Sequence, residues 1–427
     1  MVIEMTDGQI IQILKRELAP ALGCTEPVAI AYAAAKARAI LGTVPKRAQI
    51  NVSRNILKNA MGVGIPGTDM VGLEMAAALG IIGGNADAIL EVLKDVTQED
   101  ILLAKKYAKE NVRVALKDTP KKLYIEVVLE TEDDSSVVVI EDSHTNITKM
   151  AHGLTVLYEN GNCEELADRG ADYKGLNVER IYQCITSVDL EELKFLDEAV
   201  RMNWAVSQEG LNGEYGLNVG RSIMGSRGNK TPAEDISSYA AAVTAAAADA
   251  RMSGCTLPVM TICGSGNQGI TAILPVAAAI RAIGGGEELL YRSLALSCLV
   301  TIHVKRYIGK LSALCGCGMG SSIGVCCALV YMQGGGIGQI KSAIQNMIAD
   351  VSGMICDGAK AGCALKIGTV VSGAFQCSVL ALNNYSAGDL DGIVSRDVEE
   401  TIRNLGELGN RGMADTDRVI LDMMVCR

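Results

Sequence analysis

The stretch that organises this chain reads LSALCGCGMGSSIGVCC from residue 311 to residue 327 and MICDGAKAGCALK from residue 354 to residue 366. Six of the fourteen cysteines lie within residues 311–366, and no charged residue occurs between Lys310 and Lys341. Thiolates are ligands for soft metals and iron–sulfur clusters, glycines let backbone N–H groups approach the sulfurs, and an apolar shell excludes water. The composition therefore predicts buried cysteine chemistry in this stretch.

The cysteines of this stretch do not all have the same expected role. Cys326 and Cys327 open an apolar helical run, where a cysteine packs as a small hydrophobic residue. The C-G-C pair and the C-D-G-A-K-A-G-C segment about 40 residues further on are the candidate ligands. Their spacing matches no zinc-finger or ferredoxin pattern, so spacing alone leaves open which cysteine chemistry this is.

Composition limits the class of protein. The chain has 427 residues, a length typical of two or three domains, and a net charge of −10. This charge argues against nucleic acid or an anionic membrane as a partner. Fourteen cysteines without a secretory signal predict a cytoplasmic protein with reduced thiols. The uncharged residues 311–340 are rich in glycine, which favours a buried turn and core helix over a membrane span.

The periodicity of apolar residues predicts an α+β fold, with an N-terminal mixed α/β domain and a mostly α-helical second domain. From residue 286 onward the pattern is helical, and the charged stretch at residues 167–178 predicts the boundary between domains 1–170 and 171–427. In the first domain, residues 7–19 and 28–41 have helical patterns and residues 48–57 alternate like a strand. The two β runs at residues 123–129 and 136–140 predict a hairpin.

The segment Gly23-Cys24-Thr25-Glu26-Pro27 precedes a helical pattern, which places Cys24 and Thr25 at a helix N-terminus. At that position the helix dipole lowers the pKa of a thiol, and free N–H groups bind anions. A structural role for Cys24 is as compatible with this pattern as a functional one. Glu26 also fits as an ordinary carboxylate of a first helical turn.

Residues 264–269 read Gly-Ser-Gly-Asn-Gln-Gly between a strand-like run and a helical run, which satisfies the dinucleotide pattern G-x-G-x-x-G. The match is weak because Pro275 lies in the following helix and no β-α-β repeat surrounds it. A helix N-terminus that holds a small carboxylate is the better interpretation. The chain has only three histidines, so a Ser/His/Asp hydrolase or a His-rich metal site is difficult to assemble.

Taken together, these motifs resemble the serine dehydratase-like family, which includes L-cysteine desulfidases and is related to the iron–sulfur L-serine dehydratases. The resemblance covers nearly the full length of the chain. The segments that carry it are LGCTEPVAIAYAAAKA (22–37), GVGIPGTDMVGLEMAAALG (62–80), TICGSGNQGITAILPV (261–276), LSALCGCGMGSSIGVCCAL (311–329) and CDGAKAGCALKIG (356–368).

The resemblance implies a [4Fe-4S] cluster held by three cysteines, with the fourth iron open as a Lewis acid for the leaving group. The matching positions are Cys317, Cys356 and Cys363, where Cys317 is chosen over Cys315 because it precedes the Gly-rich turn. Some related serine dehydratases close the open iron with a C-terminal cysteine. Cys426 matches that cysteine only by its position, and the residues before it predict an ordinary helix.

The chain departs from the serine enzymes at two places. Those enzymes have a His-Thr sequence where this chain has Cys24-Thr25-Glu26, and a Gly-His-Gly-Thr-Asp loop where this chain has Ile65-Pro66-Gly67-Thr68-Asp69. Both histidines are absent, and Cys24 or Glu26 stands near one of the vacated positions. The resemblance therefore favours L-cysteine over L-serine as the substrate, with serine dehydration by the same cluster as the alternative.

The motifs and the resemblance together predict the catalytic residues, the substrate-binding residues and the partners. Cys24 is the first candidate for the base and Lys360 the second, with Glu26 as a further catalytic residue. The expected partner is a small amino acid, no nucleic acid or membrane is expected, and the chain is predicted to form a homo-oligomer, a dimer. A regulatory metal module without catalysis and a nicotinamide enzyme are the rival classes. The predicted substrate-binding residues are Thr25, Thr68, Gly266, Asn267 and Gln268.

Overall fold

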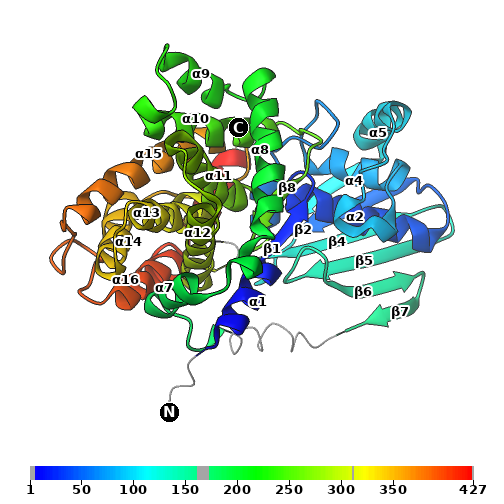
Figure 1. Cartoon of the computed structure of the whole chain (residues 1–427). Helices are drawn as coiled ribbons and strands as arrows, with labels where there is room; N and C mark the ends of the chain where they lie inside the picture. The colour runs from blue at the N-terminus through cyan, green and yellow to red at the C-terminus, as the bar shows by residue number, and fades with distance from the viewer. Residues whose placement is uncertain (1–4, 161–172, 310–311, 426–427) are drawn as a thin grey trace.

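The structure is a computed structural model that describes residues 5–160, 173–309 and 312–425, and it has two parts that lie side by side (Figure 1). One part is a six-stranded sheet with helices packed against it, and the other is a body of packed helices. Each part has a large hydrophobic core of its own. The prediction of an α+β fold is confirmed.

The strands of the sheet follow the order β3-β2-β4-β5-β6-β7, in which β2 and β3 are parallel and the other neighbours antiparallel. Ile125, Val127 and Leu129 alternate on β4 with half-buried residues and point into the core, as the period of two requires. The strands are β2 (Arg47–Val52), β3 (Val112–Leu116), β4 (Tyr124–Glu130), β5 (Ser135–Glu141), β6 (Ile147–His152) and β7 (Thr155–Glu159).

Helices cover this sheet and connect its strands. The hairpin predicted at residues 123–129 and 136–140 is confirmed as β4 and β5. The strand predicted at residues 48–57 is wrong in its second half, because Ile56 and Ala60 face the core at helical spacing and form α3 instead. The helices of this part are α2 (Thr25–Leu41), α3 (Arg54–Ala60), α4 (Leu73–Ile82), η1 (Ala86–Glu91) and α5 (Gln98–Asn111).

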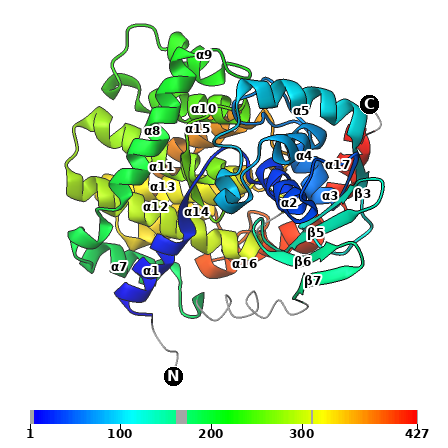
Figure 2. The ribbon, with the colours of Figure 1, turned by 90° about the vertical axis from the view of Figure 1, so that its right-hand side faces the viewer.

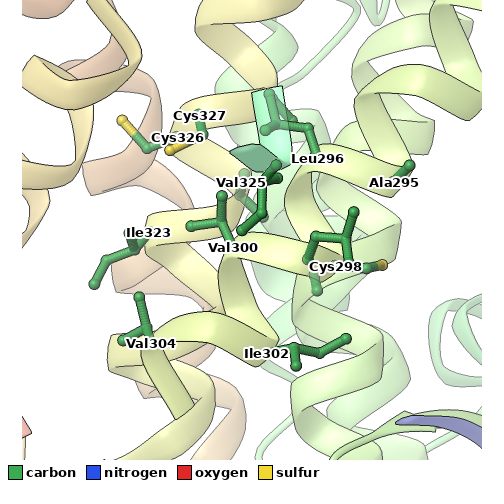
Figure 3. Close-up of a cluster of buried hydrophobic side chains, with 14 of the residues drawn as sticks. Ala295, Leu296, Cys298, Val300, Ile302, Val304, Ile323, Val325, Cys326 and Cys327 are labelled. Carbon is green, nitrogen blue, oxygen red and sulfur yellow. The ribbon is translucent and has the colours of Figure 1, made fainter. Parts of the chain in front are cut away.

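The helical body is built around α11, α12 and α13. Figure 3 shows apolar side chains of α12 and α13 packed together, among them Val300, Val325, Cys326 and Cys327. The packing role predicted for Cys326 and Cys327 is therefore confirmed. The elements of this part are α7 (Val178–Ser187), η3 (Leu190–Leu193), α8 (Leu196–Asn212), α9 (Val219–Ser226), η4 (Ala233–Asp235), α10 (Ile236–Met252), β8 (Val259–Ile262), α11 (Gly266–Ile283), α12 (Glu287–Ile308), η5 (Cys317–Ser321), α13 (Ser322–Met332), α14 (Ile337–Val351), α15 (Cys363–Leu382), α16 (Val398–Glu407), η6 (Leu408–Gly412) and α17 (Thr416–Val425).

The two ends of the chain each pack against the part that lies further away in the sequence. Helix α1 (Asp7–Glu17), which begins with a capping box at Thr6, packs in the core of the helical body. Strand β1 (Leu18–Ala21) follows it and pairs antiparallel with β8. At the other end of the chain, α17 packs against α3 of the sheet part, and the two lie side by side in Figure 2.

The division into domains 1–170 and 171–427 stays a prediction. Half of the predicted boundary at residues 167–178 lies outside the described residues, as does Cys426. By length and composition alone, α15 is apolar enough to cross a membrane, and no other helix of the described residues is. Because α15 packs against α10, α13 and α14, it has the surroundings of a core helix.

Candidate active site

A cavity of about 760 Å3 lies where the two parts meet. Most of the residues predicted for the site line this cavity, although they come from four separate segments of the chain. The structure thus brings together Cys24, Thr25, Glu26, Asn267, Gln268, Cys317, Cys356 and Cys363. Gly266, Thr68 and Lys360 are not among the lining residues.

One wall of the cavity carries the thiols of the helical body. The segments that hold Cys315 and Cys356 pair through their backbones, since the Cys315 N–H donates to Met354 at 3.0 Å and the Cys356 N–H donates to Ala313 at 2.7 Å. Cys317 begins a short π-helical turn, and Cys363 begins α15. These local structures direct the cysteines of both predicted segments to the same wall.

The thiols of Cys315 and Cys317 form a hydrogen-bonded pair, with 3.4 Å between the two Sγ atoms. The hydrogen bond from Cys317 lowers the pKa of Cys315 to about 6, against the opposing effect of burial. The same bond, together with burial, raises the pKa of Cys317. The pair therefore shares one proton at neutral pH and carries one negative charge.

The donor set on this wall fits an iron–sulfur cluster better than a single ion. In the described part of the chain, no three His, Cys, Asp or Glu side chains are arranged to hold one metal ion. Each thiolate of a cluster binds a different iron, so its ligands stand further apart than those of one ion. After burial, the neighbouring thiols Cys315 and Cys356 also raise the pKa of Cys363, which places these sulfurs within electrostatic reach of each other.

A second group of lining residues comes from the start of α2 and includes polar and charged side chains. Gly23 precedes this helix with φ of +68°, and a Cβ there would lie 2.4 Å from Pro66, so only glycine fits the turn. Cys24 is the N-cap residue, as predicted, and is buried. Glu26 accepts a hydrogen bond from Asn59 at 3.1 Å, and its Oε1 lies 4.0 Å from His144 Nε2.

The predicted lowering of the Cys24 pKa by the helix dipole is wrong. Burial raises the pKa of this thiol to about 11, and the charge of Glu26 acts in the same direction. Arg251 opposes both effects through its charge and a hydrogen bond to the thiol. A first-turn dipole is a partial charge, whereas removing a thiolate from water acts on a full charge, so desolvation dominates.

Helix α11 presents its N-terminus to the same cavity. Cys263 and Gly264 turn the chain from β8 into this helix with positive φ angles of 51° and 75°, and both residues line the cavity. Asn267 accepts a hydrogen bond from Arg251 at 3.1 Å, and Arg251 also donates to the Gly23 carbonyl at 2.8 Å. Arg251 therefore ties the Cys24 turn to the first turn of α11.

The three predicted residues outside the lining have structural contacts. Thr68 donates its hydroxyl to the Ile65 carbonyl at 2.9 Å within its own loop. Lys360 donates to the Asp357 carbonyl at 2.9 Å and forms an ion pair with the Asp357 carboxylate. A Cβ on Gly266 would lie 2.2 Å from Arg251 Nε, so this glycine makes room for the guanidinium group.

The lining residues that were not predicted from the sequence include Lys58, His144, Arg251 and Lys305. Lys58 donates to the Cys356 carbonyl at 2.9 Å and pairs with Asp417 of α17. Lys305 carries a weak sequence signal, because it is a charged residue near the end of the long apolar run of α12. The other three have no local signal, since only the tertiary fold brings them to the cavity.

The structure also bears on the dinucleotide interpretation of residues 264–269. Strand β8, which precedes this loop, pairs antiparallel with β1 in a two-stranded sheet. Pro275 lies inside α11. A dinucleotide fingerprint requires a parallel β-α-β unit, which the residues around 264–269 do not form.

Comparisons with known proteins give one consistent result. The family model described as serine dehydratase alpha chain matches residues 87–422. A UPF0597 protein of Clostridium perfringens is 45% identical over 416 residues, which covers 97% of each chain. A UPF0597 protein of Aeromonas hydrophila is 44% identical over 416 residues, covering 97% of this chain and 95% of its own. One of Bacteroides thetaiotaomicron is 41% identical over 424 residues, covering 99% and 98%.

Proposed function

Because this chain belongs to the serine dehydratase alpha chain family, we propose that it is a lyase that eliminates sulfide from L-cysteine, giving pyruvate, ammonia and hydrogen sulfide. One observation favours L-cysteine over L-serine as the substrate. Cys24, a thiol on the sheet part, lines the same cavity as Cys317, Cys356 and Cys363 of the helical body. A thiol thus stands at the substrate cavity, near one of the positions where the serine enzymes that this chain resembles have a histidine.

Cys317, Cys356 and Cys363 would hold a [4Fe-4S] cluster in this proposal. When bound, the cluster supplies a Lewis-acidic iron that makes sulfide a better leaving group. The neighbouring ammonium groups suit such a site. Lys58 and Lys366 each donate to a backbone carbonyl of the Cys356 segment, at 2.9 Å and 2.7 Å, and so hold positive charge beside the thiolates.

The residues of the chain bind the substrate and accept its Cα proton. The first turn of α11, with Asn267 and Gln268, offers backbone N–H groups to the substrate carboxylate, and Thr25 lines the same cavity. Cys24 accepts the Cα proton, and the electron pair of the Cα–H bond forms the Cα–Cβ double bond as the Cβ–S bond breaks. The products of this step are 2-aminoacrylate and sulfide, and water then hydrolyses the imine form to pyruvate and ammonia.

Arg251 supports Cys24 as the base ahead of Lys360. The base must be a thiolate when it acts, and the guanidinium group of Arg251 is the one group that opposes the raised pKa by both charge and a hydrogen bond. Lys360, the second candidate, is paired with Asp357 away from the cavity lining. Glu26 contributes by holding Asn59 and by facing His144.

A second candidate function, L-serine dehydration with the same cluster, has one observation in its favour. His144 lines the cavity near Glu26, from the loop between β5 and β6, so the site holds a histidine that the motif comparison did not include. Hydroxide is a poorer leaving group than sulfide and needs a proton donor more. The ratio of activities on cysteine and serine separates the two candidates.

The decisive experiment is anaerobic purification of the full chain. Iron and acid-labile sulfide should be found in the proportions of a [4Fe-4S] cluster, and L-cysteine should release pyruvate and sulfide faster than L-serine releases pyruvate. Faster turnover of serine would establish the second candidate. A bound cluster or zinc ion without turnover of either amino acid would show a regulatory metal module instead. Size-exclusion chromatography of the same sample tests the predicted dimer.

A further inference from the structure

Lys305 is a buried cation with a distinctive environment. Its side chain reaches the cavity from α12, and the residue is 6% exposed. It makes no hydrogen bond or ion pair with any residue that the structure describes. The two other lysines near the thiols differ in this respect. Lys58 pairs with Asp417, and Lys366 pairs with Asp357.

An unpaired ammonium group in such a place is costly. Transfer of a charged group from water into a protein interior costs several kcal/mol unless an opposite charge compensates it. Burial accordingly lowers the pKa of Lys305, although the nearby thiols act in the other direction. The charge of the Cys315–Cys317 pair compensates Lys305 in part, and no carboxylate of the described residues forms an ion pair with it, so the ammonium group can still bind an anion that enters the cavity.

The ammonium group of Lys305 lies next to Gly316. A Cβ on Gly316, the central residue of the C-G-C pair, would lie 2.9 Å from Lys305 Nζ and 2.6 Å from Gln268 Oε1. The lysine and the glutamine therefore approach the same point, next to the first turn of α11. Positive charge from Lys305 and from the helix N-terminus meets there, which is the electrostatic environment of a carboxylate site.

Gln268 adds an unused acceptor. Its Nε2 donates to the Ile262 carbonyl at 3.1 Å, which fixes the orientation of the amide and leaves Oε1 facing Gly316. This oxygen is buried and has no hydrogen-bond partner among the described residues. A buried cation next to a buried hydrogen-bond acceptor suits a ligand that has an anionic group and a hydrogen-bond donor attached to the same carbon atom. The carboxylate and ammonium groups of an α-amino acid have this arrangement.

The geometry points to a zwitterion subsite in which Lys305 binds the α-carboxylate and Gln268 Oε1 accepts a hydrogen bond from the α-ammonium group. This inference rests on the proposed function, and it deepens that function by restricting the substrates to free α-amino acids. Amides and esters of cysteine and peptides that begin with cysteine lack the α-carboxylate charge, peptides that end with cysteine lack the α-ammonium group, and all of these are excluded. The subsite does not depend on whether sulfide or hydroxide leaves.

Unreactive ligands test the subsite in the anaerobically purified holoenzyme. L-Alanine has both charged groups but no leaving group, whereas L-alaninamide lacks the carboxylate charge. We expect calorimetry to show that L-alanine binds at least about tenfold more tightly than L-alaninamide, the scale of a charge-assisted hydrogen bond. In Lys305→Met this preference should fall to within about twofold, and Lys305→Arg should keep most of it.

A matched control separates this role from general electrostatics. The variant Lys121→Met removes another lysine of the same cavity, one that is paired with Asp142. It should keep the preference for L-alanine over L-alaninamide. If Lys305→Met does not fold, Lys305→Gln serves as the second neutral variant. For Gln268, Gln268→Met should reduce the preference for L-alanine over propionate, which lacks the ammonium group.

Two results would overturn the inference. One is a Lys305→Met protein whose preference for L-alanine equals that of the unchanged protein. The other is a variant that loses iron while its preference is retained, which would assign Lys305 to the thiolates. Failure of the proposed function is recognised separately, because turnover of cysteine or serine plays no part in these binding measurements.

Discussion

The two groups of cysteines in residues 311–366 are close in sequence but differ in their surroundings. Cys315, Cys317, Cys356 and Cys363 line a cavity that also contains ammonium groups and a helix N-terminus. Cys326 and Cys327, about ten residues from the C-G-C pair, lie on α13 within the apolar core of the helical body (Figure 3), and the Cys327 sulfur lies 3.9 Å from the Ile340 carbonyl of α14. Both groups are buried or nearly so, so burial does not distinguish a ligand from a packing residue.

The difference lies in what opposes the desolvation of a thiolate. Burial raises the pKa of Cys326 and of Cys327, and no cation is near enough to counter it. In the cavity, the pKa of Cys315 is lowered to about 6 by the thiol of Cys317, with help from Lys366 and Lys305. Within the cavity group only Cys315 has a lowered pKa, because burial raises the pKa of Cys356 and of Cys363 and the bond to Cys315 raises that of Cys317. Those three thiols would lose their protons on binding a metal, and the neighbouring ammonium groups favour the thiolates that result.

The sharpest way to break this comparison is to exchange single thiols for hydroxyls. Cys317→Ser, Cys356→Ser and Cys363→Ser should each lose the bound iron and all measurable turnover, because serine is a poor ligand for cluster iron. Iron analysis, the visible absorbance and the cysteine assay check this outcome. Loss of iron in Cys315→Ser with retention in Cys317→Ser would reverse the assignment within the C-G-C pair.

Cys24 belongs to neither group, since it comes from the sheet part and lies beside Arg251. If it is the base, Cys24→Ala should keep the iron and lose turnover by at least about a hundredfold, the scale of general-base removal. Exchange of the Cα proton of the substrate with deuterium from solvent should slow in parallel. Loss of iron in this variant would instead make Cys24 a ligand, and unchanged turnover would make it a packing residue.

The raised pKa of Cys24 leads to a pH dependence. With a pKa of about 11, the fraction of thiolate at neutral pH is small and increases about tenfold for each pH unit. The value of kcat/KM should therefore rise with pH between about 7 and 9. A flat profile over this range would contradict a thiolate base.

Arg251 should set the position of that profile. Because its guanidinium group lowers the pKa of Cys24, Arg251→Met should move the profile to higher pH and reduce kcat/KM at pH 7 by about tenfold for each unit of displacement. Arg251→Lys keeps the charge and is the control for it. An equal loss at every pH in Arg251→Met would indicate that the residue acts through its contacts with Gly23 and Asn267 alone.

The sequence was sufficient for features that depend on local patterns. Helix α1, the β4–β5 hairpin, the apolar helices and the packing of Cys326 and Cys327 all follow from periodicity and composition over short windows. Cys24, Asn267, Cys317, Cys356 and Cys363 line one cavity. The motifs that contain them resemble those of one family, and this resemblance is what predicted a common site.

Residues whose role depends on long-range packing were not predictable in this way. Arg251 looks like an ordinary basic residue at a helix C-terminus, and its contact with Cys24 arises only when α10 and α2 meet. Lys58 similarly acquires its ion pair from Asp417, more than 350 residues away in the chain. The pKa of Cys24 was misjudged for the same reason, since the helix dipole is local and visible whereas desolvation depends on the whole fold.

The smallest effect on activity is expected from the core group. Cys326→Ser and Cys327→Ser should retain the iron and keep kcat within about twofold, but each should lower the free energy of unfolding by about 1–3 kcal/mol, because a hydroxyl is harder to bury than a thiol. The Cys327 sulfur lies 3.9 Å from the Ile340 carbonyl, which can accept a hydrogen bond from a serine there. Cys327→Ser should therefore lose less stability than Cys326→Ser, as measured by the urea midpoint, with the two alanine variants as controls for lost volume. If Cys326→Ser loses iron, the boundary between the two groups of cysteines is misplaced, and α13 takes part in holding the cluster.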